Sequence, residues 1–252
     1  MKSIQAKIQA IQKELNIESF VKLICKCGSD KEVFFRMEFL DTPLCKECYN
    51  KLLMELEKKR RIENTNDYLI QAGVYENELE YSFDNFKGDF EELQKLKEYP
   101  HQKELYDLIM IGGTGVAKTH LSIAIMRELI KRGCKSHKMH YYTENEIIKI
   151  LNSSHKENNF EYYYDKFTDY ELLIIDDLGR KKPSEATISN ITDLIDDRYK
   201  KNKKSIINTN LVLESDNGQA NILNLYGQPL FSRLWKYDIV FINLPDYRQK
   251  KK

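Results

Sequence analysis

Long apolar segments are missing from this sequence. None of its apolar runs approaches the roughly 20 residues that a membrane-spanning helix needs, and the N-terminus lacks the apolar stretch of a signal peptide. We therefore expect a soluble, cytoplasmic protein with no membrane partner. An excess of one charge is also missing, because 40 Lys and Arg residues face 39 Asp and Glu residues. With a net charge of only +1, any binding of nucleic acid must depend on local basic clusters.

Cysteine is scarce outside one short region. Of the five cysteines, four form two close pairs near the N-terminus: Cys25 with Cys27, and Cys45 with Cys48. This pattern is not typical of a secreted disulfide framework. Two close pairs flanking a hairpin-sized, strand-like segment suit a tetrahedral Zn²⁺ site of four thiolates, which would be structural because no position is left for water. The alternative is four reduced thiols in a small core.

The composition of the 252-residue chain, with 41% hydrophobic and 31% charged residues, indicates a globular protein.

Two amphipathic or charged helices are expected in the N-terminal part of the chain, at residues 4–15 and 51–61. The apolar stripe of the first either packs on its own small domain or binds a partner. The second ends in a basic cluster at 58–61, which is either a solvated helix end or a contact for nucleic-acid phosphates.

A glycine-rich turn follows a short apolar strand at residues 108–111 and leads directly into an apolar helix. This order is what a phosphate-binding loop requires, because glycines let successive N–H groups point at phosphate oxygens and the helix adds its N-terminal amides. Lys118 would reach the β- and γ-phosphates of ATP, and the Thr119 hydroxyl would bind Mg²⁺. The predicted nucleotide-binding residues are Gly112, Gly113, Thr114, Gly115, Val116, Ala117, Lys118, Thr119 and His120.

One position departs from the pattern of such loops. The glycine that normally precedes the lysine is Ala117, whose methyl group would crowd the loop where it closes on phosphate. Because alanine is the smallest side chain that could replace glycine, we expect ATP binding to survive in weakened form, with the hydrolysis rate in doubt.

Two acidic residues follow a fully apolar segment at 172–175, which has the composition of a central parallel strand. In open α/β sheets, ligands gather at the carboxyl ends of the strands. Asp176 is therefore expected to hold Mg²⁺ and Asp177 to orient or deprotonate the attacking water. The alternative is an ordinary acidic turn between a strand and a loop.

Short apolar segments alternate with helical segments through the rest of the chain. Strands are expected at 108–111, 139–143, 172–175, 205–209 and 239–244, and helices at 90–103, 121–132, 144–151, 184–199 and 229–235. This alternation predicts an α/β fold with a parallel sheet flanked by helices.

Asn210 follows the strand expected at 205–209. Its amide would hydrogen-bond the γ-phosphate or the attacking water; the alternative is that it is only a turn residue. A strongly basic run covers residues 198–204.

Several segments together resemble a known family. They are GGTGVAKTHLSIAI, LLIIDDLG, DRYKKNKKSIINTNL, LFSRL, the terminal DYR and the upstream YSFDNF. Over roughly residues 80–248 these are similar to the bacterial replicative helicase loaders of the DnaC/DnaI type and to their sister group, the IstB transposition helpers. Both groups are AAA+ ATPases. The N-terminal cysteine module resembles the zinc-bearing N-terminus of some loaders, especially phage-type ones.

The resemblance implies a role for each matching residue. Lys118 and Thr119 would be the Walker A residues, Asp176 and Asp177 the Walker B pair, and Asn210 the first sensor. Arg233 would be an arginine finger that completes a neighbouring subunit's site, so that ATP joins self-associating protomers. Arg248 is a candidate second sensor. The helical lid of other AAA+ proteins is expected to be absent.

The implied domain organisation has three parts. Residues 1–62 would form a helicase-interaction domain with the four-cysteine zinc site, 63–80 a linker, and 81–252 the AAA+ domain. The implied function is an ATP-dependent loader that binds a hexameric DNA helicase and delivers it onto single-stranded DNA, with DNA contacts from Lys200, Lys201, Lys203 and Lys204, or from Arg60 and Arg61. The alternatives are an IstB-like helper of a transposase and a nucleotide-dependent DNA-binding regulator with little hydrolysis.

Overall fold

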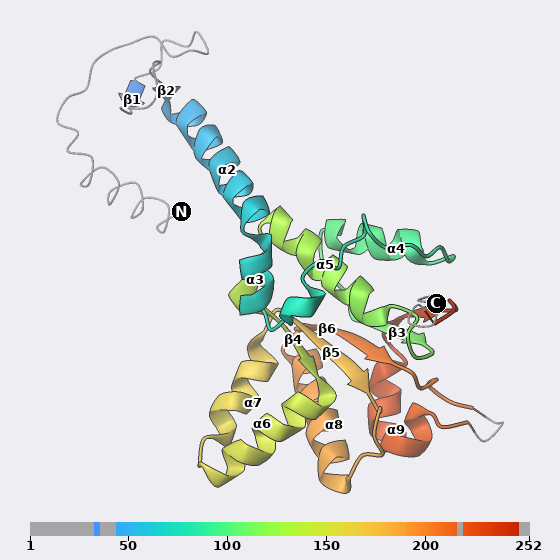
Figure 1. Ribbon diagram of the computed structural model, residues 1–252. Coiled ribbons are helices and arrows are strands. Elements are labelled where there is room, and N and C mark those ends of the chain that lie inside the picture. The colour runs from blue at the N-terminus through green and yellow to red at the C-terminus, as the bar shows by residue number, and fades with distance from the viewer. Residues whose placement is uncertain (1–32, 36–43, 216–218, 247–252) are drawn as a thin grey trace. The chain divides into compact units, whose positions relative to one another are not determined.

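The computed structural model describes residues 33–35, 44–215 and 219–246. The chain folds into two compact units, Met1–Arg60 and Arg61–Lys252. In the first unit, the short strands β1 (Val33–Phe35) and β2 (Leu44–Cys45) pair antiparallel, and helix α2 (Lys46–Glu63) starts directly after β2 and runs across the boundary (Figure 1). Cys25, Cys27 and the helix expected at 4–15 lie outside the described residues. The linker and the limits of the functional domains remain predictions.

The second unit is built on a five-stranded sheet whose paired strands all run parallel. Its strand order is β4-β5-β6-β3-β7, so that β3 lies between two strands that follow it much later in the chain. The strands are β3 (Leu108–Gly112), β4 (Met139–Thr143), β5 (Leu172–Leu178), β6 (Lys204–Thr209) and β7 (Asp238–Ile242). The predicted parallel α/β fold is thereby confirmed.

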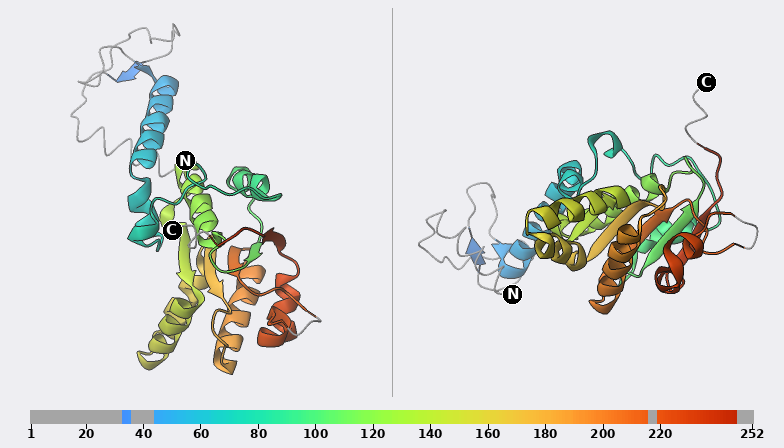
Figure 2. Two further views of the ribbon diagram at one scale, coloured as in Figure 1. Left: turned by 45° about the vertical axis from the view of Figure 1, so that its right-hand side comes forward. Right: turned by 90° about the horizontal axis from the view of Figure 1, so that it is seen from below.

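Helices cover both faces of this sheet. Successive strand residues point to opposite sides, and here the residues on both sides are apolar, so both faces must be buried. Met110 and Ile174 belong to one buried core, while Ile109 and Ile175 belong to the other. The first core is closed by α3 (Thr65–Gln71), α4 (Leu93–Glu98) and α5 (Lys118–Arg132). The second is closed by α6 (Glu144–Lys156), α7 (Phe160–Asp169), α8 (Glu185–Lys200) and α9 (Ile222–Leu234). Figure 1 and Figure 2 show these three layers. Short 3₁₀ turns are η1 (Glu76–Glu78), η2 (Tyr99–His101) and η3 (Ser136–Lys138).

Local sequence signals account for several helix ends. Ser184 accepts a hydrogen bond of 3.2 Å from the Thr187 N–H and caps α8, as its position before the helix predicts. Thr143 and Glu146 form a reciprocal capping box at the start of α6. Gly133, at φ 106°, ends α5 in the left-handed conformation that favours glycine.

The structure differs from the predicted elements in several places; for example, helix α3 lies in the predicted linker. Residues 160–169, for which the sequence predicts no element, form helix α7, and its Phe167 belongs to the second core. Strand β5 continues through the acidic pair to Leu178. Helix α9 starts seven residues earlier than expected and is kinked at Gly227, where φ is 80° and Pro229 follows. Among the described residues, no helix is both long and apolar enough to cross a membrane.

Candidate nucleotide-binding site

The loop between β3 and α5 lies at the carboxyl edge of the sheet. In the parallel ladders Ile111 pairs with Thr209 and Thr143 pairs with Asp176, so the ends of four neighbouring strands meet there. Asp176 on β5 and Asn210 after β6 are thereby brought beside the loop. The sequence prediction placed these residues together for the same reason, and the structure brings them together; their roles remain predictions.

Lys118, the first residue of α5, points its ammonium back into the loop. It donates hydrogen bonds of 2.8 Å to the carbonyl oxygens of Gly112 and of Gly113, and one of 2.6 Å to Oδ1 of Asn210. The side chain is buried, with 7% of the residue exposed. The Asn210 amide in turn donates to the Thr114 hydroxyl at 3.3 Å. A cation fixed at the start of a 15-residue helix, whose N-terminal amides are positively polarised, suits an anionic ligand.

Thr119 and Asp176 form the second part of the site. The Thr119 hydroxyl donates a hydrogen bond of 2.7 Å to Oδ2 of Asp176, and the same oxygen accepts a bond of 2.6 Å from the Tyr141 hydroxyl. Burial and the nearby charge of Asp176 raise the pKa of Tyr141, so the phenol stays protonated and can only donate to the carboxylate. Asp176 is 3% exposed. Its position is therefore fixed by two hydroxyl groups, of which the sequence indicated only Thr119.

Asp177 is held in a backbone conformation that residues other than glycine adopt only occasionally. Its φ is 57°, in the left-handed region, and its N–H donates to Oδ1 of Asp176 at 2.9 Å. The carboxylate forms an ion pair of 2.7 Å with Arg180, whose side chain is 71% exposed. Exposed pairs of this kind contribute little stability, so the Asp177 carboxylate can leave Arg180 at small cost.

A buried glutamate fixes the turn that follows Asp177. Both carboxylate oxygens of Glu144 accept hydrogen bonds, one from the Gly179 N–H at 3.0 Å and the other from the Tyr226 hydroxyl. Burial raises the pKa of Glu144. Gly179 has φ 73°, and a side chain there would strike Leu211. Sequence reasoning missed Glu144, because it stands at the start of a helix where glutamate is common.

Ala117 adopts φ 73° and ψ 24°, the left-handed conformation. The backbone thus explains why glycine is usual at this position, whereas the sequence argument invoked crowding by the methyl group. An L-residue other than glycine reaches this region at a cost of roughly 1 kcal/mol. Gly115 has φ 77°, and there a side chain would also collide with the Asp246 carboxylate, so glycine is required on both grounds.

A hollow of about 710 Å³ opens in front of the loop. Its walls are the loop itself, the turn after β5 and a segment upstream of the loop that contributes Tyr81, Asn85 and Phe86. The His120 ring stacks on Tyr81 with 4.6 Å between centroids, and burial lowers the pKa of His120. Volume and lining fit a nucleoside triphosphate, with the phosphates at the loop and the base beside the aromatic wall.

A half-buried carboxylate lies near the acidic pair. Burial first, and then the charge of Asp176, raise the pKa of Glu78 to about 7. The Oε2 atom of Glu78 is buried and has no hydrogen-bond partner among the described residues.

Mg²⁺ normally takes one or two protein oxygens together with substrate phosphates and water, so Asp176 and Thr119 are a fitting donor set.

Zinc has no support from the part of the chain that the structure describes. No group of three or more His, Cys, Asp or Glu side chains in it could hold a metal ion. Cys45, the last residue of β2, is buried, and Cys48 in α2 is partly exposed. Cys25 and Cys27 lie outside the described residues. The four-thiolate site therefore remains a prediction.

Arg233 does not line this hollow. Its guanidinium forms an ion pair with Asp196 on α8 and lies 5.1 Å from the centroid of the Tyr199 ring. In the predicted role as an arginine finger, it would act on a different protomer. Arg248 lies outside the described residues.

Three lysines of the basic run at 198–204, which begins in the last turn of α8, form ion pairs. Lys200 pairs with Asp196 and Asp197, Lys201 with Asp169, and Lys203 with Glu171. Arg198 is fully buried and donates to the carbonyl oxygens of Phe167 and Tyr170, among others. The run also precedes β6, at the edge of the sheet opposite to the loop. The DNA contact predicted for Lys200, Lys201, Lys203 and Lys204, or for Arg60 and Arg61, stays a prediction.

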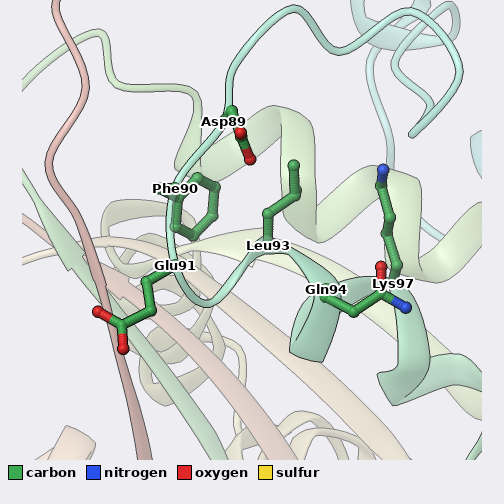
Figure 3. Close-up of a pocket in the computed structure, with 6 residues that line it drawn as sticks. All are labelled: Asp89, Phe90, Glu91, Leu93, Gln94 and Lys97. Atoms are coloured by element: carbon green, nitrogen blue, oxygen red, sulfur yellow. The ribbon is translucent and has the colours of Figure 1, made fainter.

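A second hollow lies beside α4, away from the loop. Phe90 and Leu93 form its apolar floor, and the side chains of Asp89, Glu91, Gln94 and Lys97 surround them (Figure 3). None of the predicted nucleotide-binding residues lines it. The hollow at the loop is therefore the candidate site for the predicted nucleotide.

The chain matches a family model and is similar to several known proteins. The family model of the IstB-like ATP binding protein matches residues 12–252. The chromosomal replication initiator protein DnaA of Onion yellows phytoplasma (strain OY-M) is 25% identical over 199 residues, which cover 77% of this chain and 38% of that protein. The putative ATP-binding protein of insertion sequence IS232 from Bacillus thuringiensis subsp. berliner is 29% identical over 109 residues, covering 43% of this chain and 42% of that protein. This chain thus spans less than half the length of either relative.

Among solved structures, the crystal structure of the DnaC helicase loader has a TM-score of 0.58 at 20% identity, and the match covers 67% of this chain and 100% of that one. At this identity the likeness shows the fold alone. The family match includes both the phosphate loop and the acidic pair. The chain belongs to the family of IstB-like ATP-binding proteins, as its motifs predict.

Proposed function

We propose that this protein is an ATPase that binds a hexameric replicative helicase and delivers it onto single-stranded DNA. The observation that carries the proposal is the convergence of Lys118, Thr119, Asp176 and Asn210 around one hollow that fits a nucleoside triphosphate. The fold likeness to the DnaC helicase loader, over the whole length of that structure, supports the loader among the functions of the family.

Within the site, each side chain has a role that its position supports. Lys118 and the loop amides bind the β- and γ-phosphates, and Thr119 and Asp176 hold Mg²⁺, which neutralises charge on the phosphates when bound. Asp177 orients the attacking water once its carboxylate has left Arg180. Asn210 contacts the γ-phosphate side of the site through its amide, exchanging its bond with Lys118.

Self-association would use Arg233. In the single chain Asp196 holds this arginine beside Tyr199, on a surface that also exposes Trp235. On assembly the guanidinium leaves Asp196 and reaches the triphosphate of the neighbouring protomer. ATP then stabilises the contact between protomers, because one site takes residues from two chains.

The N-terminal unit is proposed to bind the helicase and to carry a structural Zn²⁺ held by Cys25, Cys27, Cys45 and Cys48. Metal analysis of the full chain, purified without chelator, tests the ion. We expect one zinc per chain, lost when Cys45 and Cys48 are both changed to serine. Absence of stoichiometric zinc from the unaltered protein would contradict the proposal.

A second candidate function is the ATPase helper of a transposase. The insertion-sequence ATP-binding protein supports it, because its identity to this chain, 29%, exceeds that of the replication initiator. A third is a nucleotide-dependent DNA-binding regulator with little hydrolysis, supported by the alanine at position 117.

Binding to purified partners separates these functions. The full-length protein with ATP and Mg²⁺ is mixed with the replicative helicase of its own host, or with a transposase encoded in the same genome, and the complexes are separated by size. We expect a complex with the helicase that requires residues 1–60, and faster transfer of the helicase onto single-stranded DNA. A complex with the transposase alone would establish the second function instead.

A further inference from the structure

One wall of the nucleotide hollow belongs to a segment without regular secondary structure, residues 79–86. Its Tyr81 ring stacks on His120 at 4.6 Å and an interplanar angle of 18°, and its Phe86 ring meets His120 edge-on at 5.5 Å. All three side chains line the hollow together with the phosphate loop. Flat aromatic surfaces of this kind stack well on a nucleobase.

Two side chains of α5 hold this segment. His120 Nε2 lies 2.8 Å from the Ser82 carbonyl oxygen, and because a carbonyl only accepts, this nitrogen carries the proton. Arg127 Nε donates to the Tyr81 carbonyl oxygen at 3.0 Å, and Arg127 Nη2 donates to the carbonyl oxygen of Leu79 and, at 3.0 Å, to Oδ1 of Asn66. Arg127 follows His120 by seven positions, two turns along one face of the helix.

The guanidinium of Arg127 is half-buried, and burial lowers its pKa. Its planar array of donors bridges three acceptors on two parts of the chain, α3 and the 79–81 segment. A lysine ammonium on the same stem would lack that fork and could not span them. Arg127 does not line the hollow, so any effect on the nucleotide acts through the aromatic wall.

We propose that Arg127 is a positioning residue that, with His120, holds the aromatic wall in place and thereby sets the affinity for the base of a purine nucleoside triphosphate. The inference rests on the proposed function, in which the hollow binds ATP. The phosphates are bound at the other side of the hollow, by the loop and Lys118. Loss of Arg127 therefore weakens the part of the binding that depends on the base and spares the part that depends on phosphate.

The test compares two ligands, ATP and inorganic tripolyphosphate, which share the phosphates and differ in the nucleoside. Dissociation constants are measured with Mg²⁺ for the full-length protein and for Arg127→Gln. The matched control is Arg132→Gln at the far end of the same helix. We expect Arg127→Gln to weaken ATP binding about tenfold, equivalent to about 1.4 kcal/mol, and tripolyphosphate binding less than twofold. The control should change neither.

A second variant guards against misfolding. Arg127→Lys keeps the charge and the packing of the stem, so we expect it to fold and to show the same loss confined to ATP. An equal loss for both ligands, or no loss for either, would overturn the inference and leave the proposed function standing. Unaltered protein that binds neither ligand would overturn the proposed function and the inference together.

Discussion

The ammonium of Lys118 at the start of α5 donates a hydrogen bond of 2.6 Å to Oδ1 of Asn210, which follows β6 and lies 92 positions later in the chain. The contact links the phosphate loop to the neighbouring strand in the sheet. A ligand phosphate entering the loop must compete for the same ammonium, so Asn210 is placed to respond to the presence of nucleotide.

Replacing Asn210 by alanine tests this contact. If the amide acts on the γ-phosphate or the attacking water in the transition state, we expect ATP turnover to fall about 100-fold with little change in ATP affinity. Steady-state turnover and equilibrium binding measure the two quantities. The exposed Asn152 on α6, changed to alanine, is the control and should be silent. Unchanged turnover in Asn210→Ala would assign this residue to the turn alone.

Tyr141 provides a test of the metal site. Its hydroxyl donates to the same oxygen of Asp176 that accepts from Thr119, so Tyr141→Phe leaves the proposed Mg²⁺ ligand less firmly oriented. Partners of this kind typically alter metal affinity 10- to 100-fold, and we expect the Mg²⁺ concentration for half-maximal turnover to rise about tenfold. Tyr142→Phe, one position along β4 with its ring against Phe167, is the control. Equal Mg²⁺ requirements in the two variants would refute this role.

Ala117 and Ala124 allow a paired experiment on backbone conformation. Ala117→Gly relieves a left-handed alanine, so we expect the free energy of unfolding to rise by about 0.5–1 kcal/mol, part of the gain being offset by the freedom of glycine in the unfolded chain. Ala124→Gly lies inside α5 and is fully buried, so it should lower it by about 2 kcal/mol, through helix propensity and the loss of a buried methyl group. Denaturant unfolding measures both. A destabilised Ala117→Gly protein would show that the methyl group is needed for packing.

Glu78 predicts a pH dependence of stability. Its pKa is about 7 in the folded protein against an ordinary value of 4.5, so between these values the native state holds a proton that the unfolded state has lost. Stability from this group is complete below pH 4.5 and is lost as the pH rises through 7. Glu78→Gln should remove this loss of stability above pH 7, because glutamine does not ionise.

Because Glu78 is only half-buried, we expect an effect of about 1 kcal/mol, or a rise in Tm of about 2–4 °C at pH 8 that is absent at about pH 4.5. Thermal unfolding without nucleotide or Mg²⁺ measures it, and Glu76→Gln on the same turn is the exposed control. A Tm difference that does not change with pH would show that the pKa of Glu78 is not raised in the folded protein.

Much of the site could be predicted from sequence because its parts occupy fixed places in a parallel sheet. An apolar run, a glycine turn and Lys118 predict where a phosphate loop starts, and the acids after a second apolar run must meet it at the carboxyl edge. Strand β4 has the bounds that its residues predict. These inferences depend on the order of the motifs along the chain and on the spacing of the apolar residues, and both can be read from the sequence.

The rest depends on contacts between distant residues. Nothing in the sequence distinguishes Tyr141, which faces Asp176, from a tyrosine that only packs in the core. Lysines 200–203 have the composition of a basic patch, but their carboxylate partners include Asp169 and Glu171, about 30 positions earlier. Helix α7 is not evident from the sequence, because it contacts the second core through Phe167 and the partly buried rings of Tyr163 and Tyr164, whereas Tyr162 is exposed.

We propose that the loop from Gly112 to Thr119 binds ATP and that Lys118 is required for its hydrolysis. The most direct test is ATP turnover and ATP binding by the unaltered protein and by Lys118→Ala, with Lys131→Ala in the last turn of the same helix as control. We predict Mg²⁺-dependent turnover that is abolished in Lys118→Ala and retained in Lys131→Ala. Turnover that persists in Lys118→Ala, or unaltered protein that binds ATP but never hydrolyses it even with its helicase and DNA present, would contradict the claim.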